Sequence, residues 1–262
     1  MAVCLAVMSE EVQDRAPGFR AMAVLGPLPD LPAQRQPRRP VEGPQAFLIV
    51  SSPHQSGSAH FHFVDQFQVA VAGSGRVGKH EIRQGSVHYA NAYTPYGPIV
   101  AGADGLSYLT LRNRIDYGGG SMPKSSALRK RGDGSLIAGR PRAYYWDYDP
   151  PHACNETVAG PYDDGLEVIR QLVGAKGDIA FAAPQGGGGQ IGVVLAGEIT
   201  EGDKRYPLWS CIFADAGDNA TGLRAGRDGA ELLVLRFPSP TVSLATVYEC
   251  YNDVAATAFL NG

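Results

Sequence analysis

The arrangement of apolar and polar residues predicts short β-strands along much of the chain. The run VAVAG at 69–73 is apolar and ends at a turn glycine, and SVHYANA at 86–92 forms a second run of strand length. Leu109 and Leu111 mark a third strand, in which every second residue is apolar. These patterns favour an all-β fold.

One segment has a different spacing. In DDGLEVIRQLVGAKG, residues 163–177, the side chains Leu166, Ile169 and Leu172 recur at the spacing of a helix face, and a glycine follows them. We therefore expect a helix there. Elsewhere, 33 glycines and 19 prolines in 262 residues disfavour long helices and favour many short strands joined by turns.

The two halves of the chain carry related sequences. AGADGLSYLTLR at 101–112 and AGRDGAELLVLR at 225–236 share the frame AG-x-DG-x-x-x-L-x-LR. A shift of 124 positions aligns 60–112 with 184–236 without a gap and gives 15 identities in 53 positions. Chance would give roughly three or four. The predicted strands coincide in the two copies, so the chain is interpreted as a duplicated all-β unit.

The repeat also suggests domain boundaries. We expect a first domain over 18–120, a connector over 121–142 and a second domain over 143–255. The connector is rich in glycine and in basic residues, a composition that is typical of a solvated linker.

Two histidines stand one residue apart at the start of the first copy. His60-x-His62 is followed after three residues by Gln66 and after six more by Gly73. This spacing resembles the first motif of the cupin superfamily, in which HxH precedes a glutamate and then a glycine. Glutamine replaces the glutamate here. With its two copies, the chain resembles a bicupin.

The second cupin motif, a P-x-G followed by a histidine, is degenerate. Residues 91–93 read Asn-Ala-Tyr at the P-x-G position, and Tyr96 stands at the histidine position. The resemblance therefore depends on the first motif and on the repeat.

The resemblance implies two tandem jelly-roll β-barrels with few short helices, and one divalent metal ion in the first barrel. Alternate residues of a strand share a face, so His60 and His62 can offer two imidazoles to one ion. In the second copy these positions align with Pro184 and Gly186, which supply no ligand side chain. We expect one metal ion per chain, with the second barrel serving structure, dimer contacts or pocket closure.

The remaining ligands are left open by the sequence. Gln66 offers a neutral amide oxygen, but Gln190 is retained in the second copy without histidines, so a structural role for Gln66 is equally open. His88 aligns with Ile212, which places it in a barrel interior as a third ligand or a proton carrier. Tyr96 is interpreted as a ligand, a catalytic acid or base, or a pocket wall.

These features predict a metal-dependent enzyme acting on a small oxygenated organic substrate. A mononuclear iron or manganese dioxygenase is favoured, and zinc or nickel would instead suit an isomerase or lyase. The alternative is a bicupin that binds a small molecule without catalysis, which the degenerate second motif favours.

Charge, hydrophobicity and cysteine content limit the expected partners and cellular location. A net charge of −3 gives no electrostatic reason to expect nucleic acid as a partner. No apolar run approaches the roughly 20 residues that cross a bilayer, so no membrane partner is expected. The four cysteines are widely separated, which favours reduced thiols and a cytoplasmic protein. A homodimer is the expected assembly.

Overall fold

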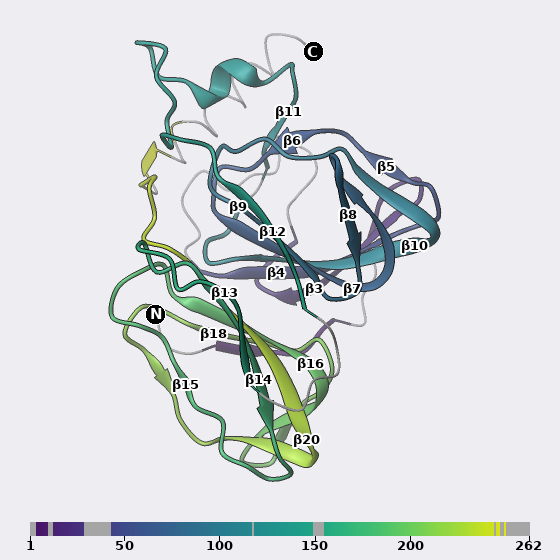
Figure 1. Ribbon diagram of the computed structural model, residues 1–262, viewed down its shortest axis with the longest axis vertical. Helices are drawn as coiled ribbons and strands as arrows, with labels where there is room; N and C mark the ends of the chain where they lie inside the picture. The colour runs from purple at the N-terminus through teal and green to yellow at the C-terminus, as the bar shows by residue number, and fades with distance from the viewer. Residues whose placement is uncertain are drawn as a thin grey trace. The chain divides into compact units, whose positions relative to one another are not determined.

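The computed structural model describes residues 4–9, 13–28, 43–116, 118–148, 155–243, 245–246 and 249. The chain divides into two compact units whose main spans are Gly26–Tyr145 and Trp146–Pro240. We refer to the sheets of these two spans as the first and the second barrel. Each barrel is built from antiparallel strands, as the sequence predicted (Figure 1).

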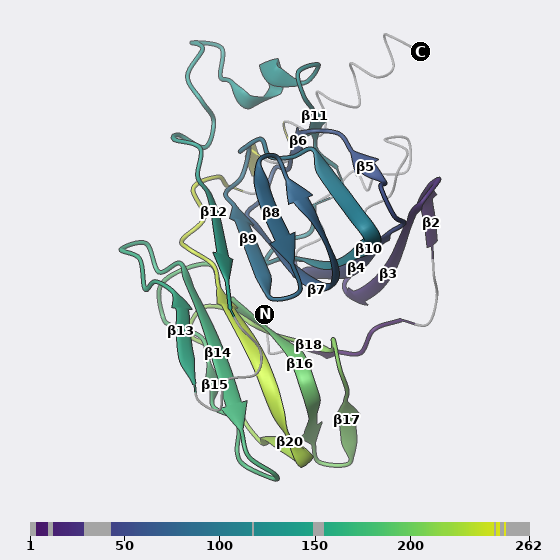
Figure 2. The same ribbon diagram turned by 45° about the vertical axis from the view of Figure 1, so that its right-hand side comes forward.

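The first barrel contains a nine-stranded sheet in the order β12-β9-β7-β10-β4-β3-β2, with β8 paired to β7 and β5 paired to β10. A two-stranded sheet of β6 and β11 completes it, and the 3-10 helix η2 (Ser126–Arg129) follows β11 (Figure 2). The bounds are β2 (Gln13–Ala16), β3 (Phe19–Leu25), β4 (Gln45–Ser51), β5 (Ser56–Gly57), β6 (His60–Phe61), β7 (Gln66–Val77), β8 (His80–Arg83), β9 (Ser86–Ala90), β10 (Ile99–Arg112), β11 (Gly120–Ser121) and β12 (Ala143–Asp147).

The second barrel contains a seven-stranded sheet in the order β1-β18-β16-β20-β14-β13, with β17 paired to β16, and a two-stranded sheet of β15 and β19. The bounds are β1 (Cys4–Ala6), β13 (Glu156–Ala159), β14 (Glu167–Val173), β15 (Phe181–Ala182), β16 (Gln190–Glu201), β17 (Lys204–Tyr206), β18 (Cys211–Ala214), β19 (Asn219–Ala220) and β20 (Leu223–Arg236).

The repeat found in the sequence is a repeat of topology. The order β9-β7-β10-β4 in the first barrel recurs as β18-β16-β20-β14 in the second, and β8 and β17 are added to equivalent strands. The register agrees as well, because Gln68 pairs with His88 and, 124 residues later, Gly192 pairs with Ile212. The all-β fold and the three strands predicted in each copy are confirmed.

Each barrel has a glycine where two long strands bend together, β7 with β10 in the first and β16 with β20 in the second. We call these positions the glycine corners, and they explain part of the shared sequence. Gly73 and Gly197 both have positive φ, at 72° and 69°. A Cβ at Gly73 would lie 2.2 Å from the carbonyl oxygen of Gly105, and one at Gly197 would lie 2.1 Å from that of Gly229. Neighbouring strands approach too closely there for any side chain, and the register shifts at this corner in both barrels.

The helix predicted over 163–177 is wrong. Residues Glu167–Val173 form β14, which pairs with β13 and β20. Leu166, Val168 and Arg170 are all fully buried, so the true period is two. The alternation is hidden in the sequence because a charged residue, Arg170, occupies a buried position and is paired with Glu231 at 2.7 Å.

The predicted domain boundaries stay a prediction, but the structure adds detail at the connector. Residues 121–142 fall in the same compact unit as the first barrel. They begin in β11, which pairs with the histidine-bearing strand β6, and continue through η2. The connector is therefore packed against the first barrel over part of its length.

No helix among the residues that the structure describes is long and apolar enough to span a membrane. Of the four cysteines, Cys211 is a buried free thiol, whereas Cys154 and Cys250 lie outside the described residues.

The glycine corners predict a stability effect that is confined to them. Gly73→Ala and Gly197→Ala should each lower the free energy of unfolding by about 1–3 kcal/mol or more, because alanine strains a positive φ and meets backbone. Gly132→Ala is the control, since Gly132 is exposed and a Cβ there meets nothing within 4 Å. Urea unfolding measures all three, and equal stabilities for the corner variants and the control would contradict this account.

Candidate metal centre

The HxH segment lies on a short strand at one end of the first barrel. His60 begins β6, and its backbone N–H and C=O pair with those of Tyr96 at 3.1 and 3.0 Å. The imidazole centroids of His60 and His62 are 5.1 Å apart and nearly perpendicular, and the Tyr96 ring lies 4.6 Å from that of His60. The two histidines predicted to act together are therefore neighbours beside a tyrosine.

Both imidazoles are oriented through the same ring nitrogen. His60 Nδ1 donates to the carbonyl oxygen of Ser58 at 2.7 Å. His62 Nδ1 lies 2.5 Å from Asp116 Oδ2 and 2.8 Å from the carbonyl oxygen of Gly118. Carbonyl and carboxylate oxygens only accept, so Nδ1 carries the proton in both rings and the lone pair lies on Nε2.

The same surroundings favour uncharged imidazoles. Burial, together with the smaller effect of the nearby His62, lowers the pKa of His60 to about 4. Burial also lowers the pKa of His62, and the charge of Arg112 adds to the effect, while Asp116 opposes it. At neutral pH both rings are therefore available as ligands without losing a proton.

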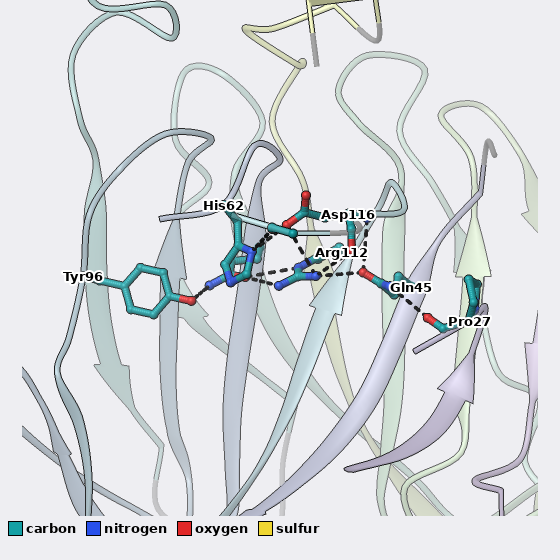
Figure 3. A network of polar contacts seen from close by, with 8 residues as sticks. Pro27, Gln45, His62, Tyr96, Arg112 and Asp116 are labelled. Carbon is teal, nitrogen blue, oxygen red and sulfur yellow. Dashed lines mark hydrogen bonds and ion pairs between the residues drawn. The ribbon is translucent and has the colours of Figure 1, made fainter. Parts of the chain in front are cut away.

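A buried guanidinium, that of Arg112, is linked to His62 through Asp116. Arg112, at the end of β10, is 1% exposed and lies 3.6 Å from Asp116 Oδ2. It donates to Gln45 Oε1 at 2.8 Å, and Gln45 Nε2 in turn donates to the carbonyl oxygen of Pro27 at 2.8 Å. Figure 3 shows the contacts that link His62 to Asp116, Asp116 to Arg112, and Arg112 to Gln45.

Gln66 belongs to the same network. Its Oε1 accepts two hydrogen bonds from Arg112, at 3.2 Å from Nε and 3.1 Å from Nη2, and its Nε2 donates to the hydroxyl oxygen of Tyr96. The second barrel repeats the arrangement, since Arg236 Nε donates to Gln190 Oε1 at 3.1 Å. These contacts favour the structural role of Gln66. Its role as a metal ligand stays a prediction and would require Oε1 to leave Arg112.

Tyr96 is a buried phenol whose ring lies near the imidazoles of His60, His62 and His88. Burial raises the pKa of its hydroxyl, and the charge of Arg112 offsets only part of that. The phenol is therefore protonated at neutral pH, accepts from Gln66 and keeps its own O–H to donate.

His88, on β9, contacts Tyr96 but not as part of a compact ligand cluster. The two ring centroids are 4.9 Å apart. His88 Nδ1 donates to Gln68 Oε1 at 2.8 Å, whereas its Nε2 is buried and has no hydrogen-bond partner. His88 also lines an internal cavity of about 10 Å³, room for about one water molecule.

An aromatic stack connects His88 to the partly exposed His80. Tyr145 of β12 stacks on His88 at 4.6 Å and on His80 at 3.7 Å. Nothing in the sequence indicated that Tyr145 would join these two histidines.

The second barrel has apolar groups where the first has imidazoles. Phe181 pairs with Ala220, whereas His60 pairs with Tyr96, the residue 124 positions before Ala220. By this register Phe181, rather than Pro184, occupies the position of His60, because the ungapped alignment slips by three residues at this end. Phe181 is buried in a cluster with Ile212 and Leu223, so the interior is filled by side chains.

The donor set limits what the site can hold. Across the described part of the chain, no three side chains of His, Cys, Asp or Glu are arranged to hold a metal ion. The residues present nevertheless fit an ion bound by the Nε2 atoms of His60 and His62, with further ligands from the Tyr96 hydroxyl, substrate or water. Asp116 would be the hydrogen-bonded carboxylate that commonly orients a metal-binding histidine.

Sequence reasoning missed Arg112, Asp116, Gln45 and Gly118. One signal for Arg112 was present, because the pair Gln66 and Arg112 recurs as Gln190 and Arg236. Asp116 had no such signal, since the residue at its position in the second copy is Pro240.

Comparison with known proteins supports the fold. No protein-family profile matches the sequence, and no curated protein sequence matches it. Among solved structures, the chain is similar to the bacterial pirin YhhW from Escherichia coli in complex with nickel(II), with 11% identity, a TM-score of 0.57, and 90% and 99% of the two chains covered. It is similar to quercetin 2,3-dioxygenase from Acinetobacter baumannii, with 11% identity, a TM-score of 0.54 and 98% of each chain covered. AerE from Microcystis aeruginosa matches with 14% identity, a TM-score of 0.54, and 89% and 98% covered.

The chain thus has the cupin fold, in its two-barrel, bicupin form. The fold predicted from the HxH spacing and the repeat is confirmed.

Replacing the buried Arg112 of the first barrel should lower the free energy of unfolding far more than replacing Arg236 of the second. Arg112→Met leaves the fully buried Asp116 without its cation, and we expect a loss of about 3–5 kcal/mol in the free energy of unfolding. Arg236→Met is the matched control, because the Arg236 side chain is 26% exposed and solvent screens its pair with Glu167. Denaturant unfolding compares the two, and an equal loss in both variants would show that burial does not decide the cost.

The buried His88 predicts a pH dependence of stability. Burial lowers the pKa of His88 to about 3, so the unfolded chain takes up this proton first as pH falls below about 6.5. Stability is therefore full above that pH and decreases towards pH 3, by about 2 kcal/mol between pH 7 and pH 5 from His88 alone.

His88→Ile, which introduces the residue found at 212, should remove that part of the slope. Chemical unfolding of the metal-free protein at pH 7 and pH 5 measures it. If stability changes equally with pH in wild type and variant, His88 takes up its proton at the same pH in the folded and the unfolded chain.

Proposed function

We propose that the first barrel binds one divalent metal ion through Nε2 of His60 and Nε2 of His62. The observation that carries the proposal is the fixing of both Nδ1 atoms by oxygen acceptors, one of them the carboxylate of Asp116. Such hydrogen bonds set the tautomer and the ring orientation that metal-binding histidines need. The cupin fold and the nickel present in the structure of the E. coli pirin add support.

The remaining coordination would come from this barrel and from the substrate. Tyr96 is the proposed nearest additional donor, since its ring lies beside both imidazoles. His88 and Gln66 are proposed as further ligands if His88 turns its free Nε2 towards the ion or if Gln66 releases Arg112. Iron or manganese is preferred for a set of neutral donors, and zinc or nickel would also be accepted.

We propose that the protein is an enzyme acting on a small oxygenated organic molecule, with dioxygenation preferred over isomerase or lyase chemistry. The bound metal would supply Lewis-acid polarisation of a substrate oxygen, or a binding place for dioxygen. Tyr96, protonated at neutral pH, would donate a hydrogen bond or a proton to a substrate oxygen, and the neutral His88 would accept one. The fold shared with a quercetin 2,3-dioxygenase supports the preference.

A second candidate function is binding without catalysis. It is favoured by the donor set, in which the described residues hold no group of three His, Cys, Asp or Glu ligands, and by the filled interior of the second barrel. In that case the first barrel would hold its small molecule without a metal. A cytoplasmic location and a homodimer stay predictions in either case.

Metal binding separates the two functions. The purified protein, stripped with a chelator, is titrated with Fe²⁺, Mn²⁺, Zn²⁺ and Ni²⁺ by calorimetry, beside the double variant His60→Ala/His62→Ala. We expect one ion per chain in the wild type and none in the double variant. If the two proteins bind the same amount of every ion, the enzyme proposal fails.

Asp116→Asn tests the orienting carboxylate in the same titration. The amide keeps the size of the side chain but loses its charge, and we expect metal affinity to fall about 10–100-fold. His80→Ala is the control. Tyr145 separates His80 from His88 in the chain of ring contacts, and His80 is not among the hydrogen-bond partners of His60 and His62.

A further inference from the structure

The glycine segment 118–120, which leads into the connector, contacts the HxH strand directly. β11 pairs with β6, so that Gly120 lies opposite Phe61 and Ser121 opposite His60. The N–H of Met122 donates to the carbonyl oxygen of Ala59 at 2.9 Å. In Figure 1, β11 and β6 lie side by side at one end of the first barrel.

This approach is possible only because the contacting residues are glycines. A Cβ at Gly119 would lie 2.2 Å from the carbonyl oxygen of Phe61 and 3.1 Å from His62 Nδ1. A Cβ at Gly120 would lie 2.3 Å from the ring of Phe61. The close approach brings the carbonyl oxygen of Gly118 to 2.8 Å from His62 Nδ1, where it shares the proton with Asp116.

The connector itself is anchored around Phe61 of the same strand. Arg129 Nε donates to the carbonyl oxygen of Tyr93 at 2.7 Å, and its guanidinium lies 6.0 Å from the centroid of the Phe61 ring. Ile137 is buried in an apolar cluster with Phe61 and Phe63, and Met122, Leu128 and Ala138 pack against that cluster. The anchors hold the glycine segment where it meets His62.

We propose that residues 118–120, just before the connector, are a positioning element of the metal site. Resting on the proposed function, this assigns to the segment 118–120 the task of holding His62 in its metal-binding orientation. Linkage then requires the reverse effect, because an ion that binds only the oriented imidazole stabilises the connector contacts.

The experiment compares Gly119→Ala with two controls in the full chain. Gly132→Ala lies in the connector, where a Cβ meets nothing within 4 Å, and Gly197→Ala strains the second barrel, which contains none of the candidate metal ligands. Co²⁺ affinity is measured by calorimetry, and backbone amide exchange at 120–122 is measured with and without Co²⁺.

We expect Gly119→Ala to weaken Co²⁺ binding by about tenfold or more, as loss of an orienting contact does, and to speed exchange at 120–122. Both controls should bind Co²⁺ like the wild type, and Co²⁺ should slow exchange at 120–122 in the wild type. Unchanged affinity in Gly119→Ala, or a loss of the same size in Gly197→Ala, would overturn the proposal.

A second variant covers the case in which Gly119→Ala does not fold. Ile137→Ala loosens the apolar anchor without adding atoms at His62, and we expect weaker Co²⁺ binding and faster exchange at 120–122. Wild-type values for both would overturn the proposal.

If the wild type binds no Co²⁺ or other ion, the proposed function fails and the positioning is judged in the metal-free protein. Solvent exchange of the His62 Nδ1 proton, followed by NMR, should then be faster in Gly119→Ala than in the wild type and in Gly132→Ala. Equal rates in the three proteins would overturn the positioning role as well.

Discussion

A buried cation organises the first barrel. The guanidinium of Arg112 is removed from water, and such a charge is tolerated only when an opposite charge and hydrogen-bond acceptors surround it. Its partners come from the two strands that flank β10 and from the loop that follows it: Gln66 at the start of β7, Gln45 at the start of β4, and Asp116 beyond the end of β10. Asp116, held in this way, lies within hydrogen-bond distance of His62. The orientation of the candidate ligand is thus a consequence of neutralising Arg112.

The second barrel shows what the same framework does without a site. Arg236 has the partners Gln190 and Glu167 on the equivalent strands, so the strand ends are joined in a similar way. Pro240 stands there at the position of Asp116, and Phe181 occupies the place of His60. The Phe181 ring fits because it packs against Gly192, where a Cβ would lie 2.6 Å from the ring. Gly192 pairs with Ile212. The interior of this barrel is an apolar core, whereas that of the first combines apolar residues with Tyr96 and His88.

The sequence was sufficient for the architecture, whereas His60 and His62 as metal ligands stay a prediction. The repeat located the main strands because the glycine corners and the period-two leucines are under the same steric demands in both copies. It was misleading where the copies differ in loop length, so His60 was matched to Pro184 instead of Phe181. The helix expected at 163–177 was an error of periodicity, because Arg170 is a buried charge that a polar-versus-apolar pattern reads as exposed. Asp116 and Gly118 could not be found, since they reach His62 across 54 and 56 residues of chain.

The partners that surround Arg112 have a consequence for the order of folding and the proposed metal binding. In many small metalloproteins the ligands repel or remain unpaired until the metal arrives, so folding and metal uptake are one event. Here the charges next to the candidate ligands are already balanced by protein groups, and both imidazoles are neutral with fixed tautomers. If the first barrel binds an ion as proposed, the chain can therefore fold first and bind the ion afterwards. The identity of that ion would then follow from which metal is available to the folded barrel, rather than from the conditions of folding.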